Sequence, residues 1–292
     1  MNFAFLIHPL TPRYMDRVTN LTRPFPSQLV EWAIKHKKPY LIKKFHLNSV
    51  DGYFVGVPLT SSQLVHLDKK FVLDRLLQAC NKASDYGAEI VSLGGYTAIS
   101  SNQGQDLVGK VDIGLTTGRA YTVAVVMEQV KPYLRKESVV AVVGAEGSIG
   151  RACTKLAKKY DLIKVTRENF NEVYKADIVI TASSDIAQII DSARLKKDCV
   201  VCDAAKPSDL ANRINRKDIT IINGGLVKLP TPVDFGFDFD CPKNTVYACM
   251  AEPMILALEG RKGNYCIGRD IDLEMVNEIG RLGKKHGFEV VG

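Results

Sequence analysis

Residues 138–167 constrain the fold of this chain more than any other stretch. Residues 139–143 (VVAVV) are all apolar, as expected of a parallel strand that is buried on both faces. They lead directly into residues 144–150 (GAEGSIG), where glycines permit a sharp turn and let backbone amides approach an anion. A second strand follows after a helix whose apolar stripe comprises Ile149, Ala152, Cys153, Leu156 and Ala157. This order of strand, turn, helix and strand predicts a dinucleotide-binding domain.

Strands and helices alternate regularly after residue 138. Apolar segments typical of strands recur at residues 139–143, 162–166, 177–181, 199–203 and 219–222. Such alternation is typical of a doubly wound parallel sheet. We therefore predict a Rossmann-like α/β domain over residues 138–243.

A second, mixed α/β lobe is predicted for residues 1–120, and we assign the substrate to it. Its pattern indicates a strand near residues 3–7, a helix at 27–36, hairpin strands at 40–47 and 52–58, an amphipathic helix at 64–86 and a strand at 88–93. The fold class predicted for the whole chain is thus α/β, with a Rossmann-like sheet and a second lobe.

The remaining segments are expected to be helical. Thr117 can cap a helix over residues 118–133, so residues 121–137 are predicted to link the two lobes. Residues 244–292 contain the patterns of two further helices, at 244–259 and 273–286. We expect these helices to pack back on the substrate lobe.

The glycine turn supplies the first group of candidate cofactor residues. Its spacing is G-x-x-G-x-x-G, whereas the commoner dinucleotide fingerprint is G-x-G-x-x-G. Glu146 would repel a diphosphate, so its side chain is expected to point to solvent. We expect the diphosphate to lie against Gly144, Ala145, Gly147, Ser148 and Ile149.

The tip of the second strand bears on the choice of cofactor, because Thr166, Arg167 and Glu168 follow one another there. A cation at this position binds the 2'-phosphate of NADP(H), whereas a carboxylate binds the ribose hydroxyls of NAD(H). The order of these residues favours NADP(H) through Arg167; NAD(H) is possible if Glu168 faces the ribose. Later strand ends are expected to line the nicotinamide side with Ala182, Ser183, Gly224 and Gly225.

Composition narrows the class of protein. The net charge of +7 is spread along the chain without a dense basic block, which argues against nucleic-acid binding but is compatible with an acidic protein partner. No apolar run approaches the roughly 18 residues that span a bilayer. The seven cysteines are scattered without a secretory start, which predicts free thiols and a cytoplasmic location.

Each cysteine is expected to be a small buried hydrophobe rather than a nucleophile, and Cys249 differs only slightly from the others. The five histidines show no metal-ligand spacing, and Cys199 and Cys202 would point to opposite faces of a strand. Cys249 is expected about one turn into a helix capped by Asn244 or Thr245, where the helix dipole would stabilise a thiolate. Pro253 is expected to kink that helix one turn later.

Several passages together resemble the long-chain acyl-[acyl-carrier-protein] reductase family of cyanobacteria. They occur in the family's order and are residues 92–97 (SLGGYT), 116–118 (TTG), 142–150 (VVGAEGSIG), 223–227 (NGGLV), 247–252 (YACMAE) and 286–288 (HGF). The resemblance implies that Cys249 takes an acyl group from a carrier protein or coenzyme A thioester, and that NADPH reduces the acyl group to an aldehyde. It also suggests a substrate site near Gly94, Gly95, Tyr96 and Thr117.

Three departures from the family pattern bear on the acyl chain that is accepted. Glu146 replaces a neutral residue, Pro253 interrupts the helix after Cys249, and residues 203–206 (DAAK) replace a glycine-rich turn. They leave the length and type of the acyl chain open. The oligomeric state and the physiological direction of the reaction are likewise open.

Two other functions remain open at this point. One is a dehydrogenase of a small hydroxy or amino acid that resembles the shikimate dehydrogenases, with Asp68 and Lys69, or Lys110 and Asp112, as acid and base. The other is a non-catalytic sensor that binds a dinucleotide and reports to a partner.

Overall fold

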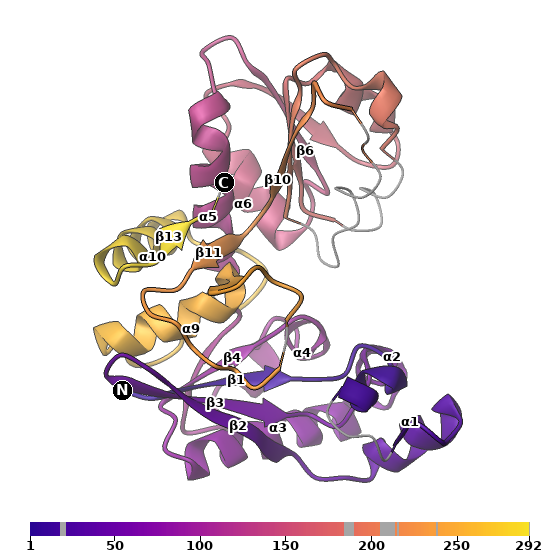
Figure 1. Ribbon diagram of the computed structural model, residues 1–292, viewed down its shortest axis with the longest axis vertical. Coiled ribbons are helices and arrows are strands. Elements are labelled where there is room, and N and C mark those ends of the chain that lie inside the picture. The colour runs from indigo at the N-terminus through magenta and orange to yellow at the C-terminus, as the bar shows by residue number, and fades with distance from the viewer. Residues whose placement is uncertain (18–21, 184–189, 205–213, 215, 238, 292) are drawn as a thin grey trace. The chain divides into compact units, whose positions relative to one another are not determined.

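The computed structural model describes residues 1–17, 22–183, 190–204, 214, 216–237 and 239–291. The chain divides into two compact units, each assembled from three segments. Unit 1 comprises Met1–Gly118, Leu229–Arg269 and Lys285–Gly287, and unit 2 comprises Arg119–Lys228, Asp270–Lys284 and Phe288–Gly292. The sheet of each unit is visible in Figure 1.

Unit 1 is built on a mixed sheet in the order β2-β3-β1-β4-β5. Its strands are β1 (Phe3–Ile7), β2 (Tyr40–Leu47), β3 (Val50–Gly56), β4 (Ile90–Leu93) and β5 (Gly114–Thr116). Strands β3, β1, β4 and β5 are parallel, and β2 is antiparallel to β3. The carboxyl ends of four strands therefore meet at one edge of this sheet.

The predicted hairpin is present, with a tighter turn than expected. Leu47 pairs directly with Val50, so the turn consists of Asn48 and Ser49. Asn48 has a φ of 51°, the left-handed conformation that closes a two-residue hairpin. The second strand consequently starts at residue 50 and not at residue 52.

The predicted helix over residues 64–86 is wrong, because two helices occupy this stretch. These are α2 (Ser61–His66) and α3 (Lys69–Asp85). The Thr60 hydroxyl accepts a hydrogen bond from the Gln63 amide in a capping box at the start of α2. The Asp68 carboxylate accepts one from the Phe71 amide at 3.0 Å and starts α3. Each cap fixes a new helix start although the apolar pattern continues.

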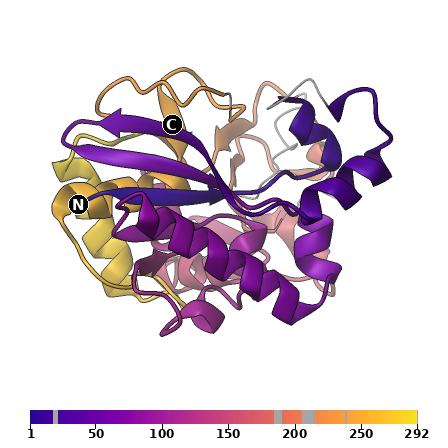
Figure 2. The same ribbon diagram turned by 90° about the horizontal axis from the view of Figure 1, so that it is seen from below.

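The two faces of the unit 1 sheet are covered differently. Helix α3 packs along one face (Figure 2) over a core that includes Leu6, Val55, Leu76 and Val91. Helix α9 (Ala248–Glu259) packs against β1, β3 and β4. The rest of the unit contains α1 (Ser27–Lys35), α4 (Tyr96–Ser100), the 3-10 turns η1 (Pro12–Arg17) and η3 (Gln105–Leu107), and β12 (Thr245–Tyr247).

The predicted helix over residues 244–259 starts later than expected. Asn244 has a φ of 61°, and the residues after it form β12 before α9 begins at Ala248. Neither Asn244 nor Thr245 is therefore the cap of the helix that carries Cys249.

Unit 2 is built on an entirely parallel sheet in the order β10-β9-β8-β6-β7. Its strands are β6 (Val139–Val143), β7 (Asp161–Val165), β8 (Ile178–Thr181), β9 (Val200–Asp203) and β10 (Thr220–Asn223). The five predicted strands are confirmed to within one residue at each end. An α/β fold with a Rossmann-like parallel sheet and a second mixed α/β lobe is thus confirmed.

Helices and short elements complete unit 2. Helices α5 (Arg119–Val130) and α6 (Ser148–Leu156) pack against each other, α6 against β6 and α5 against β9. The chain passes through η4 (Lys131–Tyr133), η5 (Phe170–Lys175) and η6 (Ser192–Arg194), and β11 (Leu226–Lys228) pairs antiparallel with β13 (Glu289–Val290). Most of α10 (Leu273–Lys285) belongs to this unit. Within the described residues, no helix combines the length and apolarity that crossing a membrane requires.

Candidate functional site

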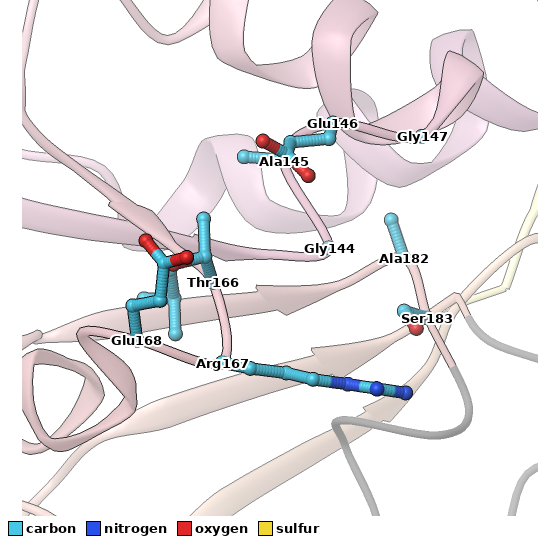
Figure 3. A pocket seen from close by; sticks show the side chains of 10 residues that line it. Gly144, Ala145, Glu146, Gly147, Thr166, Arg167, Glu168, Ala182 and Ser183 are labelled. Atoms are coloured by element: carbon cyan, nitrogen blue, oxygen red, sulfur yellow. The ribbon is translucent and has the colours of Figure 1, made fainter.

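A cavity of about 520 Å³ opens at the carboxyl ends of β6, β7 and β8 in unit 2 (Figure 3). Strands β7 and β8 lie on opposite sides of β6, so the cavity sits where the strand order reverses. Ligands of open parallel sheets bind in this position. The cavity is lined by Gly144, Ala145, Glu146, Gly147, Val165, Thr166, Arg167, Glu168, Ala182 and Ser183.

Glycine is required at two places in the turn. Gly144 has a φ of 77°, and a Cβ on it would lie 2.6 Å from the Cβ of Ser183. A Cβ on Gly150 would lie 2.1 Å from the carbonyl oxygen of Gly144. These glycines therefore let the turn fold tightly between the sheet and α6.

The third glycine leaves space for a ligand. A Cβ on Gly147 would meet only the Gly144 oxygen, at 3.4 Å. Gly147 is also the residue before α6, and no side chain caps that helix. Helix α6 therefore begins directly after a residue that lines the cavity, and the N-terminus of a helix is suited to bind an anion.

The end of β7 presents opposite charges to the solvent. Arg167 and Glu168 are both exposed, and in Figure 3 the Arg167 side chain extends toward the side of Ser183, whereas that of Glu168 runs another way. The backbone amide of Thr166 donates a hydrogen bond to Oδ1 of Asn169 at 2.7 Å, which holds Thr166 in place. The Glu146 side chain is exposed, as expected, and Glu146 is also one of the residues that line the cavity.

Four of the predicted cofactor residues do not line the cavity. Ser148 and Ile149 form the start of α6. Gly224 and Gly225 form the turn after β10, where the Gly225 amide donates to Oε1 of Gln129 at 2.9 Å. A Cβ on Gly224 would lie 2.7 Å from the Ala204 amide nitrogen, so this glycine serves close backbone packing. Ala205 and Lys206, which belong to the altered turn at residues 203–206, lie outside the described residues.

Cys249 lies in unit 1, as the second residue of α9, and is half-buried. Burial, helped by the charge of the Glu252 carboxylate, raises the pKa of its thiol to about 12. The expectation of a dipole-stabilised thiolate is therefore wrong for the protein alone. Removal of the sulfur from water outweighs the helix dipole, which stabilises a charge by only about 0.3–1 kcal/mol at most sites.

A glycine presses against the backbone of Cys249. Gly118 follows β5 with a φ of 74°, and a Cβ on it would lie 2.4 Å from the Cα of Cys249. The Thr117 hydroxyl donates to the Cys266 carbonyl at 2.7 Å. The turn after β5 is thus fixed directly against the first turn of α9.

Glu252 ties the same turn to α9 and was missed by the sequence analysis. It is completely buried, and its Oε1 accepts hydrogen bonds from the Thr116 hydroxyl and from the Gly118 amide, the latter at 3.2 Å. Its position three residues after Cys249 places both side chains on one side of the helix. This spacing is the signal that could have identified it.

Pro253 does not interrupt α9, which continues to Glu259. Proline has no N–H, so it cannot donate to the carbonyl of Cys249 four residues earlier. That carbonyl lies 3.5 Å from the Ser92 hydroxyl, which donates to it from β4. Because of the proline, the Cys249 carbonyl accepts a hydrogen bond from the sheet in place of one within the helix.

The other predicted substrate residues lie at the same edge of the unit 1 sheet. Gly94, Gly95 and Tyr96 follow β4, which neighbours β5 with its following Thr117. A Cβ on Gly94 would lie 2.5 Å from the Phe5 ring. His8 follows β1 at this edge; its ring is 5.8 Å from that of Tyr96, and burial lowers its pKa below the ordinary value.

The residues named as acid and base for the alternative dehydrogenase function either have structural roles or lie away from the cavity of unit 2. Asp68 caps α3, and Lys69 forms an ion pair with Asp106 at 2.8 Å. Lys110 and Asp112 are exposed. None of these four residues lines the cavity of unit 2.

Two of the relatives found among known proteins are named as enzymes. Over 257 aligned positions the chain is 30% identical to the long-chain acyl-[acyl-carrier-protein] reductase of Synechococcus elongatus, and the match covers 74% of this chain and 75% of the relative. It is 27% identical to aminotransferase PigE of a Serratia strain, a match that covers 99% of this chain and 40% of the relative. The chain thus spans less than half of the Serratia protein.

Other comparisons add little. No known family profile matches the chain. Among solved structures, a solute-binding protein of an ABC transporter from Mycobacterium smegmatis is 9% identical, with 64% of this chain and 68% of that chain covered. The TM-score is 0.22, too low to indicate a shared fold.

Proposed function

Because the chain belongs to the long-chain acyl-[acyl-carrier-protein] reductase family, we propose that it reduces an acyl thioester to an aldehyde at the expense of NADPH. The observation that carries this proposal is the fixed position of Cys249, held between Gly118 and Ser92 at the start of a helix. A dehydrogenase that acts on an alcohol needs no such cysteine, whereas thioester reduction by way of an acyl-enzyme does.

The residues of the cavity in unit 2 fit a dinucleotide. We assign the diphosphate to Gly144, Gly147 and the first amides of α6, and the 2'-phosphate to Arg167. The volume of about 520 Å³ is typical of a cofactor pocket. NADPH supplies the hydride when it is bound.

Cys249 acts as the nucleophile. Its sulfur forms a bond to the thioester carbonyl carbon, the bond from that carbon to the carrier sulfur breaks, and the thiol proton ends on the departing carrier thiol. The raised pKa keeps the resting sulfur protonated, so the proton leaves as the new bond forms. After reduction of the acyl group, the aldehyde departs and Cys249 regains a proton.

The proposal is tested by following NADPH absorbance when the purified chain is mixed with acyl thioesters of several lengths. One series carries the acyl group on coenzyme A and the other on an acyl carrier protein, which is acidic and suits a chain of net charge +7. We expect NADPH oxidation with equimolar aldehyde. Binding of NADPH without turnover in either series would favour the sensor. Reduction of NADP+ by small hydroxy acids, with no turnover of the thioesters, would favour the dehydrogenase.

Arg167→Ser is expected to weaken the preference for NADPH. A charged hydrogen bond is worth about 1.5–3 kcal/mol, so kcat/KM for NADPH should fall by about 10- to 150-fold while that for NADH changes little. Lys164→Ser is the matched control, because Lys164 is an exposed cation of β7 that does not line the cavity. If the ratio of kcat/KM for NADPH to kcat/KM for NADH is unchanged in Arg167→Ser, the assignment of the 2'-phosphate to Arg167 is refuted.

A further inference from the structure

Helix α1 carries apolar residues on two sides, and only one side is packed. Val30 and Ile34 are buried and form a small cluster with Met15 of η1. This inner stripe is sufficient to hold the helix in place. Figures 1 and 2 show α1 at the margin of unit 1, beyond the end of the sheet.

Three large apolar side chains in α1 and just before it are exposed. Phe25 is 49% exposed, Leu29 46% and Trp32 58%. Leu29 and Trp32 are three residues apart in α1 and lie on one helical face, which His36 continues with its ring 5.0 Å from that of Trp32. Phe25 lies just before the helix, which begins at Ser27. Single exposed apolar residues are ordinary, but three large ones within eight positions, among them the only tryptophan of the chain, indicate a binding surface.

Cationic residues precede and follow these apolar residues in the sequence. Arg23 before them and Lys37 and Lys38 after them are exposed. The one acidic residue between positions 22 and 38 is Glu31, whose carboxylate accepts a hydrogen bond from the Thr60 hydroxyl at 2.6 Å on the inner side. The surface is therefore apolar along its middle and positive at its margins.

We propose that the α1 patch, defined as Phe25, Leu29 and Trp32 with Arg23, Lys37 and Lys38, docks on an anionic lipid bilayer. Tryptophan and phenylalanine insert at the level of the headgroups, and lysines beside them are attracted to anionic lipids. A protein partner of matching charge would need its own apolar groove, whereas an anionic bilayer offers both properties over any area. This inference does not depend on the proposed reaction.

The test uses Trp32 as its own reporter, because no other tryptophan contributes to the emission. The full chain is titrated with phosphatidylcholine vesicles that contain phosphatidylglycerol, and with vesicles of phosphatidylcholine alone. We expect a shift of the emission to shorter wavelength and co-sedimentation with the anionic vesicles only, both weakened by high salt. Absence of the shift with anionic vesicles overturns the proposal, as does equal binding to both kinds of vesicle.

Variants with matched controls locate the binding. Leu29→Ser removes the exposed apolar area that this side chain would bury on docking, so vesicle affinity should fall severalfold. Val108→Ser removes a side chain that is 42% exposed elsewhere in unit 1 and should leave affinity unchanged.

Charge is tested by the double change Lys37→Glu with Lys38→Glu, which should abolish binding to anionic vesicles. The same reversal at Lys158 and Lys159, an exposed pair in unit 2, should not. If the α1 variants bind like the unaltered protein, the proposal is overturned. Self-association that Leu29→Ser abolishes, detected by sedimentation without lipid, would instead make a second copy of this chain the occupant.

Discussion

Cys249→Ser is expected to lower the rate of acyl-thioester reduction by about three orders of magnitude or more, because a serine hydroxyl without an adjacent base is a far weaker nucleophile than a thiol. The measurement is NADPH oxidation at saturating thioester. NADPH binding, followed by its fluorescence, should be unchanged, since Cys249 is not among the residues that line the cavity. Mass spectrometry of the unaltered protein should reveal an acyl group on Cys249 when NADPH is withheld.

Cys241→Ser provides the control for this change. Cys241 is half-buried like Cys249 and lies eight residues earlier, before α9 begins. The Cys241→Ser variant should retain the full rate of NADPH oxidation. Reduction that survives in Cys249→Ser would exclude the covalent mechanism, and loss of activity in both variants would indicate a structural effect of the thiols.

Gly150→Ala is expected to reduce both stability and dinucleotide binding. The added Cβ would lie 2.1 Å from the Gly144 oxygen and 2.9 Å from the Cα of Ala145, and these are backbone atoms that cannot rotate away. Overpacking of this kind costs about 1–3 kcal/mol, which lowers the melting temperature by about 2–4 °C per kcal/mol in a protein of such size. Thermal unfolding and titration with NADPH measure the two effects.

Gly147→Ala separates binding from stability within the same turn. Gly147 has a φ of −68° and a ψ of 162°, which alanine adopts readily, and its Cβ would meet only the Gly144 oxygen at 3.4 Å. Stability should change by roughly 1 kcal/mol or less, while the methyl group obstructs the face on which the diphosphate is proposed to lie. NADPH affinity that is unchanged in Gly147→Ala would contradict that placement.

The sheet of unit 2 was predictable because local signals and tertiary packing agree there. An all-apolar strand must be buried on both faces, and a glycine turn leading into an amphipathic helix leaves few ways to continue. The cavity then follows, since residues at the ends of neighbouring parallel strands meet at one edge. Gly144, Thr166 and Ala182 come together in this way.

Helix boundaries and the state of the thiol were not predictable from periodicity. The apolar pattern runs through Asp68 without interruption, so only recognition of its capping role separates α2 from α3. The pKa of Cys249 depends on how much water reaches the sulfur and on Glu252 nearby. Solvent access depends on the whole tertiary arrangement, whereas the helix dipole, the one effect visible in the sequence, is smaller.

Pro253 gives the first turn of α9 a mechanical property that a helix without proline lacks. The carbonyl of Cys249 is tethered to the sheet by the 3.5 Å bond from Ser92, and no amide four residues on in its own helix can hold it. During the proposed acyl transfer the attacked carbon would change from planar to tetrahedral, so its distance and direction from the sulfur would change. A turn with one internal bond fewer can follow that movement at low elastic cost, while the remainder of α9 stays anchored on β1 and β4.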